Sequence, residues 1–189
     1  MSERAGGSAG AVVFMNLQHR PAARASRGSC YRTDRLRYLL LDRITVLAPP
    51  VARALKCVSL SDDVFVDHFP GHPVLPGALL LEAMAQLGGV LLEATERAKG
   101  HDDLHALLVM ADRLKFRRLV RPGDRVELEA TALRSSEDGG QVRTTATVDG
   151  QLVSEAELGF ALAPVEDAGL RARRKEVLDV WLAGLRRTP

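Results

Sequence analysis

The chain has 189 residues, of which 46% are apolar and 26% are charged. Both fractions match the globular norm of about 45–50% and about 25%, which excludes a disordered, collagen-like or disulfide-scaffold chain. The length suits one domain, and no uninterrupted apolar run reaches the roughly 20 residues that span a bilayer. Cys30 and Cys57 are too few for a zinc site or a stapled secreted fold, so we expect a cytoplasmic protein.

The net charge of +2 is unevenly distributed along the chain. Residues 1–33, 112–125 and 171–189 each carry a net charge of +4, so the remaining residues sum to −10. Local basic stretches in a nearly neutral chain indicate an acidic partner at one surface. We therefore expect no nucleic-acid binding.

Residues 1–33 form a basic extension rich in Ala, Gly, Ser and Arg. Its apolar piece, residues 9–15, is short for a secretory signal, and no convincing cleavage region follows it. We predict a disordered leader. A transit peptide and a signal peptide are the alternatives that this composition leaves open.

Two strands are expected over residues 38–47 and 54–60, separated by Pro49 and Pro50. A loop rich in proline and glycine, residues 68–77, then leads into a long helix over residues 78–98. Pro76 suits the entry to this helix. The first half of the helix is apolar on nearly every face, which predicts that it is buried.

Four further strands are expected after Gly100, over residues 106–111, 126–132, 142–148 and 152–163. Turn residues separate the last three strands, at 138–140 and at Asp149-Gly150. One buried helix followed by an antiparallel meander predicts an α+β fold, with a sheet wrapped around the helix over residues 34–164. Residues 165–189 predict an amphipathic helix, with an apolar face of Val177, Leu178, Trp181, Leu182 and Leu185.

Glu82 is a carboxylate inside the apolar helix, where an unpaired charge would be penalised by several kcal/mol. Gln86 lies four residues further on and can hydrogen-bond the carboxyl group from the same face. A structural ion pair with an arginine is the alternative explanation, because ion-pair networks also bury acids.

His68 begins the stiff loop that precedes this helix. Three prolines and two glycines within ten residues restrict its backbone, as suits a positioned catalytic group. We interpret His68 and Glu82 as an acid–base pair. The N–H of Gly77, near the helix N-terminus, could polarise a carbonyl oxygen.

The remaining histidines are assigned no catalytic role. His72 lies within the turn and is interpreted as structural. His19, His101 and His105 have no paired acid or ligand spacing in the sequence. His68 and His72 lack a third ligand nearby, so no metal site is expected.

Residues 67–86, DHFPGHPVLPGALLLEAMAQ, resemble the signature of the FabZ-type 3-hydroxyacyl-(acyl-carrier-protein) dehydratases. Residues 41–43, 116–118, 122–124 and 148–156 extend the resemblance over roughly residues 35–163. The resemblance implies a hot-dog fold. It also implies a site formed across a homodimer, with the histidine from one subunit and the glutamate from the other, and dimers that can assemble into hexamers.

The resemblance implies a role for each residue of the motif. His68 would remove the Cα proton of a 3-hydroxyacyl thioester, and Glu82 would protonate the departing hydroxyl group. The Gly77 N–H would polarise the thioester carbonyl, and Gln86 would orient Glu82. The product would be the trans-2-enoyl thioester, formed in fatty-acid or specialised lipid or polyketide synthesis. No metal or organic cofactor is implied.

The implied partner is acyl carrier protein, which is acidic. Basic side chains beside a site entrance can steer such a partner, and we expect docking at Arg113, Lys115, Arg117, Arg118 and Arg121. An ordinary solvated strand face is the alternative explanation for this stretch.

The sequence differs from the family pattern at Leu107, Met110 and Leu119, where a Tyr, a Gly and a Pro would be expected. These differences leave the acyl chain length undetermined. Two other functions remain open at this point: an acyl thioesterase, and a non-catalytic hot-dog subunit that binds acyl carrier protein. The FabA-type dehydratase–isomerases have an Asp at the position that corresponds to Glu82, so the chain resembles them less than it resembles the FabZ type.

Overall fold

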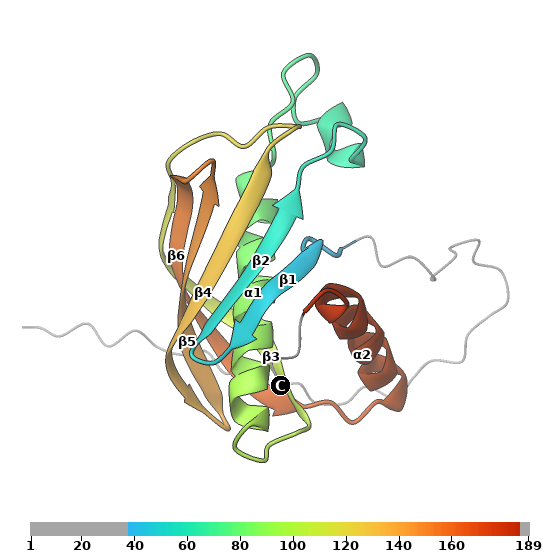
Figure 1. The fold of residues 1–189 in the computed structure, drawn as a ribbon, viewed down its shortest axis with the longest axis vertical. Helices are drawn as coiled ribbons and strands as arrows, with labels where there is room; N and C mark the ends of the chain where they lie inside the picture. Colours follow the sequence, from blue (N-terminus) through green and yellow to red (C-terminus); the bar gives the residue numbers. More distant parts are fainter. Residues whose placement is uncertain (1–37, 186–189) are drawn as a thin grey trace, which may run out of the picture. The chain divides into compact units, whose positions relative to one another are not determined.

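In the computed structural model, which describes residues 38–185, a six-stranded sheet lies along one long helix (Figure 1). The helix is α1 (Gly77–Arg97). The strand order is β1-β2-β4-β5-β6-β3, and every neighbouring pair is antiparallel. The strands are β1 (Arg43–Ala48), β2 (Val51–Cys57), β3 (Leu104–Phe116), β4 (Arg125–Ser136), β5 (Gly139–Val148) and β6 (Gln151–Pro164). The predicted α+β hot-dog fold is confirmed, while the expected leader lies outside the described residues.

Helix α1 forms the centre of the hydrophobic core. Leu80, Met84, Leu87 and Leu91 recur at helical spacing and are at most 3% exposed. Gly88 allows close contact with the sheet, because a Cβ there would lie 2.8 Å from Val142 Cγ2. By length and composition α1 could cross a bilayer, but 61% of its apolar window is buried inside the fold. This burial is typical of the core helix of a globular domain.

Several strand boundaries differ from those predicted. β2 covers residues 51–57 rather than 54–60, β4 continues to Ser136 rather than ending at residue 132, and β5 begins at Gly139 rather than at residue 142. β1 begins at Arg43 rather than at residue 38. The Leu40 N–H and the Tyr38 carbonyl oxygen are hydrogen-bonded to the side chain of Gln86 instead of to a neighbouring strand. β3 continues past residue 111, because the charged residues at its end pair with β6. The predicted turn at Asp149-Gly150 is present with positive φ at both residues.

Helix α2 (Ala168–Leu182) is attached to the sheet and to α1 by three kinds of contact (Figure 1). Val177 and Trp181 are buried, and the indole N–H of Trp181 donates to the Leu41 carbonyl oxygen at 2.8 Å. Arg174 donates to both carboxylate oxygens of Glu93, each at 3.0 Å. Glu93 is only 4% exposed, so this ion pair joins α2 to the interior.

Replacing Arg174 with Met keeps the length of the side chain but leaves the buried Glu93 without its cation. We expect the free energy of unfolding to fall by about 3 kcal/mol, as for other broken buried pairs. Urea unfolding measures the change. Lys175→Met is the control, because Lys175 is exposed on the same helix. Equal unfolding midpoints for the two variants would contradict the stabilising role of the pair.

The C-terminal end of α1 holds a second buried carboxylate, Glu96, which is 0% exposed. It accepts hydrogen bonds from Lys99 Nζ at 2.6 Å, from the Ser135 hydroxyl and from His101 Nδ1 at 3.0 Å. Burial alone would raise the pKa of Glu96, but these hydrogen bonds outweigh it and lower the pKa from 4.5 to about 2. The ionised Glu96 carboxylate therefore connects the end of α1 to β4.

The lowered pKa predicts acid sensitivity. Glu96 is protonated near pH 4.5 in the unfolded chain and near pH 2 in the folded chain. The contribution of Glu96 to the free energy of unfolding is therefore fully present above pH 4.5. As the pH falls from about 4.5 to about 2, roughly 3 kcal/mol of stability is lost. Urea midpoints across this range should fall less steeply for Glu96→Gln than for the wild type. The exposed Glu166→Gln should keep the wild-type slope, and an unchanged slope in Glu96→Gln would count against the cluster.

Candidate active site

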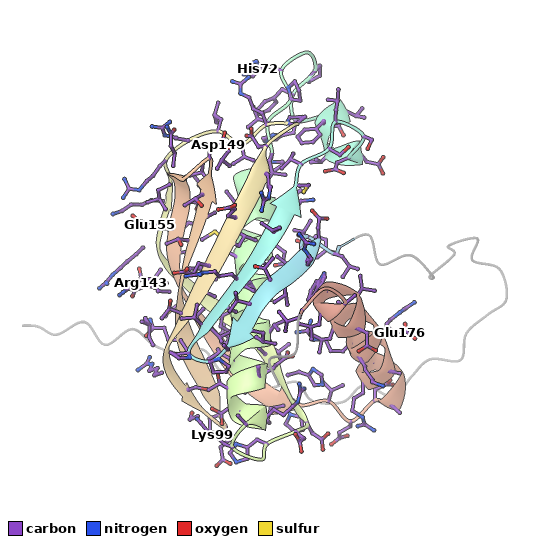
Figure 2. All side chains as sticks on the ribbon, viewed as in Figure 1. His72, Lys99, Arg143, Asp149, Glu155 and Glu176 are labelled. Atoms are coloured by element: carbon purple, nitrogen blue, oxygen red, sulfur yellow. The ribbon has the colours of Figure 1, made fainter. Side chains whose placement is uncertain are left out.

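His68 lies in the loop between a short 3-10 helix, η1 (Asp63–Val66), and α1. The loop closes on itself, because the Val74 N–H donates to the His68 carbonyl oxygen at 3.0 Å. The Leu75 N–H donates to the Val120 carbonyl oxygen at 2.8 Å, which attaches the loop to the β3–β4 connection. Figure 2 labels His72 in this loop, at the opposite end of the molecule from Lys99. The backbone of the loop thus holds His68 in a fixed place.

The His68 ring is oriented by its own loop. Nδ1 lies 2.7 Å from the Val74 carbonyl oxygen, and the Phe69 ring stacks on the imidazole with centroids 4.1 Å apart. A carbonyl oxygen can only accept, so Nδ1 carries the hydrogen in the neutral ring. Within residues 38–185 no group hydrogen-bonds Nε2. This nitrogen is therefore free to accept a proton.

Glu82 and Gln86 lie on one face of α1, and the expected hydrogen bond is present: Gln86 Nε2 donates to Glu82 Oε1 at 3.0 Å. Gln86 is itself held, since its Oε1 accepts from the Leu40 N–H and its Nε2 donates to the Tyr38 carbonyl oxygen. Glu82 is only half-buried, which corrects the expectation that it lies within the core. Its face of α1 borders a cavity rather than the sheet.

Gly77 is the first residue of α1, and Pro76 before it provides no side-chain cap. The first N–H groups of a helix have no intrahelical acceptor. No described residue accepts a hydrogen bond from the Gly77 N–H. A Cβ at Gly77 would lie 2.8 Å from Cζ of Phe116, so any larger residue would require this ring to move. The result is a free donor at the positive end of a helix dipole.

Within one described chain, no hydrogen bond joins His68 to Glu82. Glu82 borders a cavity of about 420 Å³, and His68 is not among the residues that line it. The cavity lies between α1, α2 and the β3 side of the sheet. The sequence therefore identified two groups that the isolated chain does not bring into contact.

Three members of the basic stretch, Arg113, Lys115 and Arg117, pair with carboxylates of β6. Arg113 pairs with Glu157 at 3.2 Å, and Glu155 pairs with both Lys115 and Arg117. The hydrogen bond from Arg117 also lowers the pKa of the half-buried Glu155.

The remaining two basic side chains have no carboxylate partner among residues 38–185. Arg118 donates to the side-chain oxygen of Gln151. Nη2 of Arg121 lies 3.2 Å from His72 Nε2, in the loop that carries His68.

The statement that His101 and His105 have no paired acid is wrong. His101 contacts Glu96, and His105 Nδ1 lies 3.8 Å from Glu93 Oε1. The sequence analysis did not find the role of Glu93 and Arg174 beside the cavity. The only available signal was an acid in the second half of a buried helix, 81 residues away from its partner.

A comparison with protein families matches residues 34–157 to the FabA-like domain. Proteins named 3-hydroxyacyl-(acyl-carrier-protein) dehydratase FabZ are also similar to the chain. The protein from Campylobacter jejuni is 44% identical over 123 residues, which cover 64% of this chain and 84% of that protein. The protein from Bacillus pumilus is 42% identical over 130 residues, covering 67% and 87%.

Solved structures share the fold. The dehydratase heterocomplex ApeI:P from Xenorhabdus doucetiae matches with a TM-score of 0.58 and 18% identity, over 74% of this chain and 91% of that chain. The smu.793 protein of Streptococcus mutans, bound to acetyl CoA, matches with a TM-score of 0.52 and 11% identity, over 66% and 90%. The sequence matches, rather than these distant structures, decide the family. The chain belongs to the FabA-like family and, within it, to the FabZ-type 3-hydroxyacyl-(acyl-carrier-protein) dehydratases.

Proposed function

We propose that His68 and Glu82 are the acid–base pair with which this enzyme works. The chain is a dehydratase that converts a (3R)-3-hydroxyacyl thioester of acyl carrier protein to the trans-2-enoyl form in fatty-acid biosynthesis. The observation that carries the proposal is that the hydrogen bonds of the two side chains suit His68 to accept a proton and Glu82 to donate one. His68 Nε2 is left with a free lone pair, and Glu82 has one oxygen occupied by Gln86.

The proposed reaction balances as follows. His68 Nε2 takes the proton from C2, and the electrons of that C–H bond form the C2–C3 double bond. The C3–O bond breaks, and a protonated Glu82 gives its proton to the departing hydroxyl, which leaves as water. Gln86 occupies Oε1, which leaves Oε2 as the oxygen that carries and donates the proton. Proton return from the histidine to the carboxylate resets the site.

Gly77 supports the charge that develops on the thioester carbonyl in this proposal. Its N–H lacks an acceptor among the described residues and lies at the N-terminus of α1. Donors placed in advance at a developing oxyanion are worth several kcal/mol in other enzymes. The side chain of Phe116 lies against Gly77 and would shield the carbonyl oxygen from water.

We propose a homodimer in which each site takes His68 from one chain and Glu82 from the other. β3 supports this arrangement, because it is an edge strand of 13 residues with a row of exposed apolar side chains. Leu107 and Val109 are 56% and 66% exposed. Such an edge favours pairing with another strand, and a second β3 would cover it. Assembly of such dimers into hexamers and a cytoplasmic location remain predictions that the family membership supports.

Acyl carrier protein is the proposed macromolecular partner. Of the five basic residues predicted to dock it, Arg118 and Arg121 have no carboxylate partner among residues 38–185, and Arg121 contacts His72 in the His68 loop. Arg113, Lys115 and Arg117 are partly compensated by Glu155 and Glu157, so we expect less from each of them. Unpaired charge near the entrance is the form that steers an acidic partner.

Mass spectrometry of 3-hydroxyacyl-carrier-protein substrates tests the reaction. The wild type should remove the mass of one water. His68→Ala and Glu82→Gln should each slow turnover by at least about a hundredfold, because each removes one general acid–base group. Both variants should keep the wild-type melting temperature and bind carrier protein. Turnover at the wild-type rate in either variant would refute the assignment.

Mixing the two inactive variants tests whether the site is shared. If they are refolded together, half of the dimers are mixed and each mixed dimer has one intact site, so about a quarter of the wild-type activity should return. His68→Ala refolded with itself is the matched control. No recovery in the mixture, despite exchange of subunits, would place both groups in one chain.

Arg118→Ala and Arg121→Ala test the docking surface. Each should lower kcat/KM for the carrier-protein substrate by about threefold to tenfold, because loss of a rim charge slows association. Neither should change kcat/KM for the same acyl group on pantetheine. Arg143→Ala is the control, since Arg143 lies on the sheet surface and pairs with Glu157 (Figure 2). Equal losses with both substrates would indicate damage to the site.

A further inference from the structure

The cavity beside Glu82 has a wall that the family match does not include. The match ends at residue 157, whereas Leu170, Val177 and Trp181 of α2 line the cavity. The opposite wall is α1, which contributes Glu82, Gln86, Gly89 and Glu93. These four residues follow one another at three- and four-residue spacing and so form a single stripe along the helix. The cavity therefore extends along α1, away from the proposed catalytic carboxylate.

The two acids of the stripe mark the ends of this space. Glu82 and Glu93 are separated by about 16 Å along α1, at a rise of about 1.5 Å per residue. An extended hydrocarbon advances roughly 1.3 Å per carbon, given bonds of about 1.5 Å, so about ten to twelve carbons fit this length. At the middle of this length Gly89 brings α1 close to β3, since a Cβ there would come within 3.2 Å of the Ala106 Cβ.

We propose that α2 closes the distal end of the acyl-binding slot and limits the acyl group to about twelve to fourteen carbons, of which about ten to twelve lie between C3 and the end of the slot. The proposal rests on the proposed function, because it takes Glu82 as the group beside C3 of the substrate. The occupant is the acyl chain of the thioester. It lies along the α1 stripe with its methyl end toward Trp181.

The chemistry of the distal end limits the chain. Glu93 is held there by Arg174 at 3.0 Å and by the Ala106 N–H at 3.1 Å, and His105 lies 3.8 Å away. A longer apolar chain would have to displace a buried, hydrogen-bonded ion pair, which is costly because the charges would lose their partners. An acyl chain that ends before Glu93 avoids this ion pair and can lie against the apolar part of the lining, which includes Ala85, Ala106, Leu108 and the Trp181 indole.

Helix α2 is a fixed wall rather than a loose cover. Trp181 is 1% exposed, and its N–H is bonded to the Leu41 carbonyl oxygen. The Arg174 guanidinium lies 5.8 Å from the centroid of the Trp181 ring and also holds Glu93. One arginine thus connects α2, the indole and the helix that carries Glu82. The slot keeps its length because the ion pair, the indole hydrogen bond and the buried Val177 act together.

Two matched variants on α2 test the proposal. Val177→Phe adds a ring at a buried position that lines the cavity, and Val180→Phe makes the same change at a 61% exposed position outside it. The substrates are 3-hydroxybutyryl-, 3-hydroxyoctanoyl-, 3-hydroxydodecanoyl- and 3-hydroxyhexadecanoyl-carrier protein. For Val177→Phe, kcat/KM for octanoyl and longer chains should fall about tenfold relative to butyryl. Val180→Phe should keep the wild-type ratios. The same chain-length profile in both variants would overturn the proposal.

A second measurement needs no variant, because Trp181 is the only tryptophan in the chain. The probes are two saturated decanoyl-pantetheine thioesters, one with a bromine atom at the methyl end and one with a bromine atom beside the carbonyl. Bromine quenches indole emission on contact. These probes lack a 3-hydroxyl group, so they report binding and not dehydration. The probe brominated at the methyl end should quench Trp181, and the other should not. Equal quenching by both probes, or none by either, would overturn the placement of the chain.

The two measurements separate this inference from the proposed function. Water loss from 3-hydroxybutyryl-carrier protein without selective quenching would refute the slot and leave the dehydratase mechanism intact. Selective quenching in a protein whose His68→Ala variant still removes water would support the slot and refute the assigned base.

Discussion

Helix α1 is apolar on nearly every face, so water has to be excluded along most of its length. The sheet covers the face that carries Leu80, Met84, Leu87 and Leu91. Helix α2 and the residues before β1 lie on a second side. In the proposed dimer, a second chain covers the apolar edge at β3. The arrangement of the other elements follows from the need to cover this one helix.

The polar groups of α1 are tolerated because each has a partner. Glu82 is bonded to Gln86, Glu93 to Arg174 and Glu96 to Lys99. Among residues 38–185, no buried side-chain nitrogen or oxygen lacks a hydrogen bond. The three acids nevertheless have different roles. Glu96 joins the helix to the sheet, Glu93 joins it to α2, and Glu82, which is half-buried beside a cavity, is the one left accessible to a substrate.

The stiff loop before α1 and the helix itself provide complementary chemistry. The Val74 carbonyl oxygen of the loop accepts from Nδ1 and so fixes the tautomer of His68, while the Gly77 N–H at the start of the helix has no acceptor among residues 38–185. Neither group requires a metal or an organic cofactor in the proposed mechanism. The smaller part of the chemistry, the choice of acyl length, falls in our proposal to α2, which lies beyond the family match.

Four features could be predicted from the amino-acid sequence: the α+β fold, the long buried helix, the hairpin at Asp149-Gly150 and the candidate catalytic residues. These features depend on local spacing: helical and strand periodicity, turn residues, and a motif within twenty residues. Three features depend on long-range packing: Arg174 pairs with Glu93, Gln86 holds the residues before β1, and carboxylates of β6 pair with three members of the basic stretch. Each of these contacts joins residues 38 or more positions apart, and periodicity carries no information about such pairs.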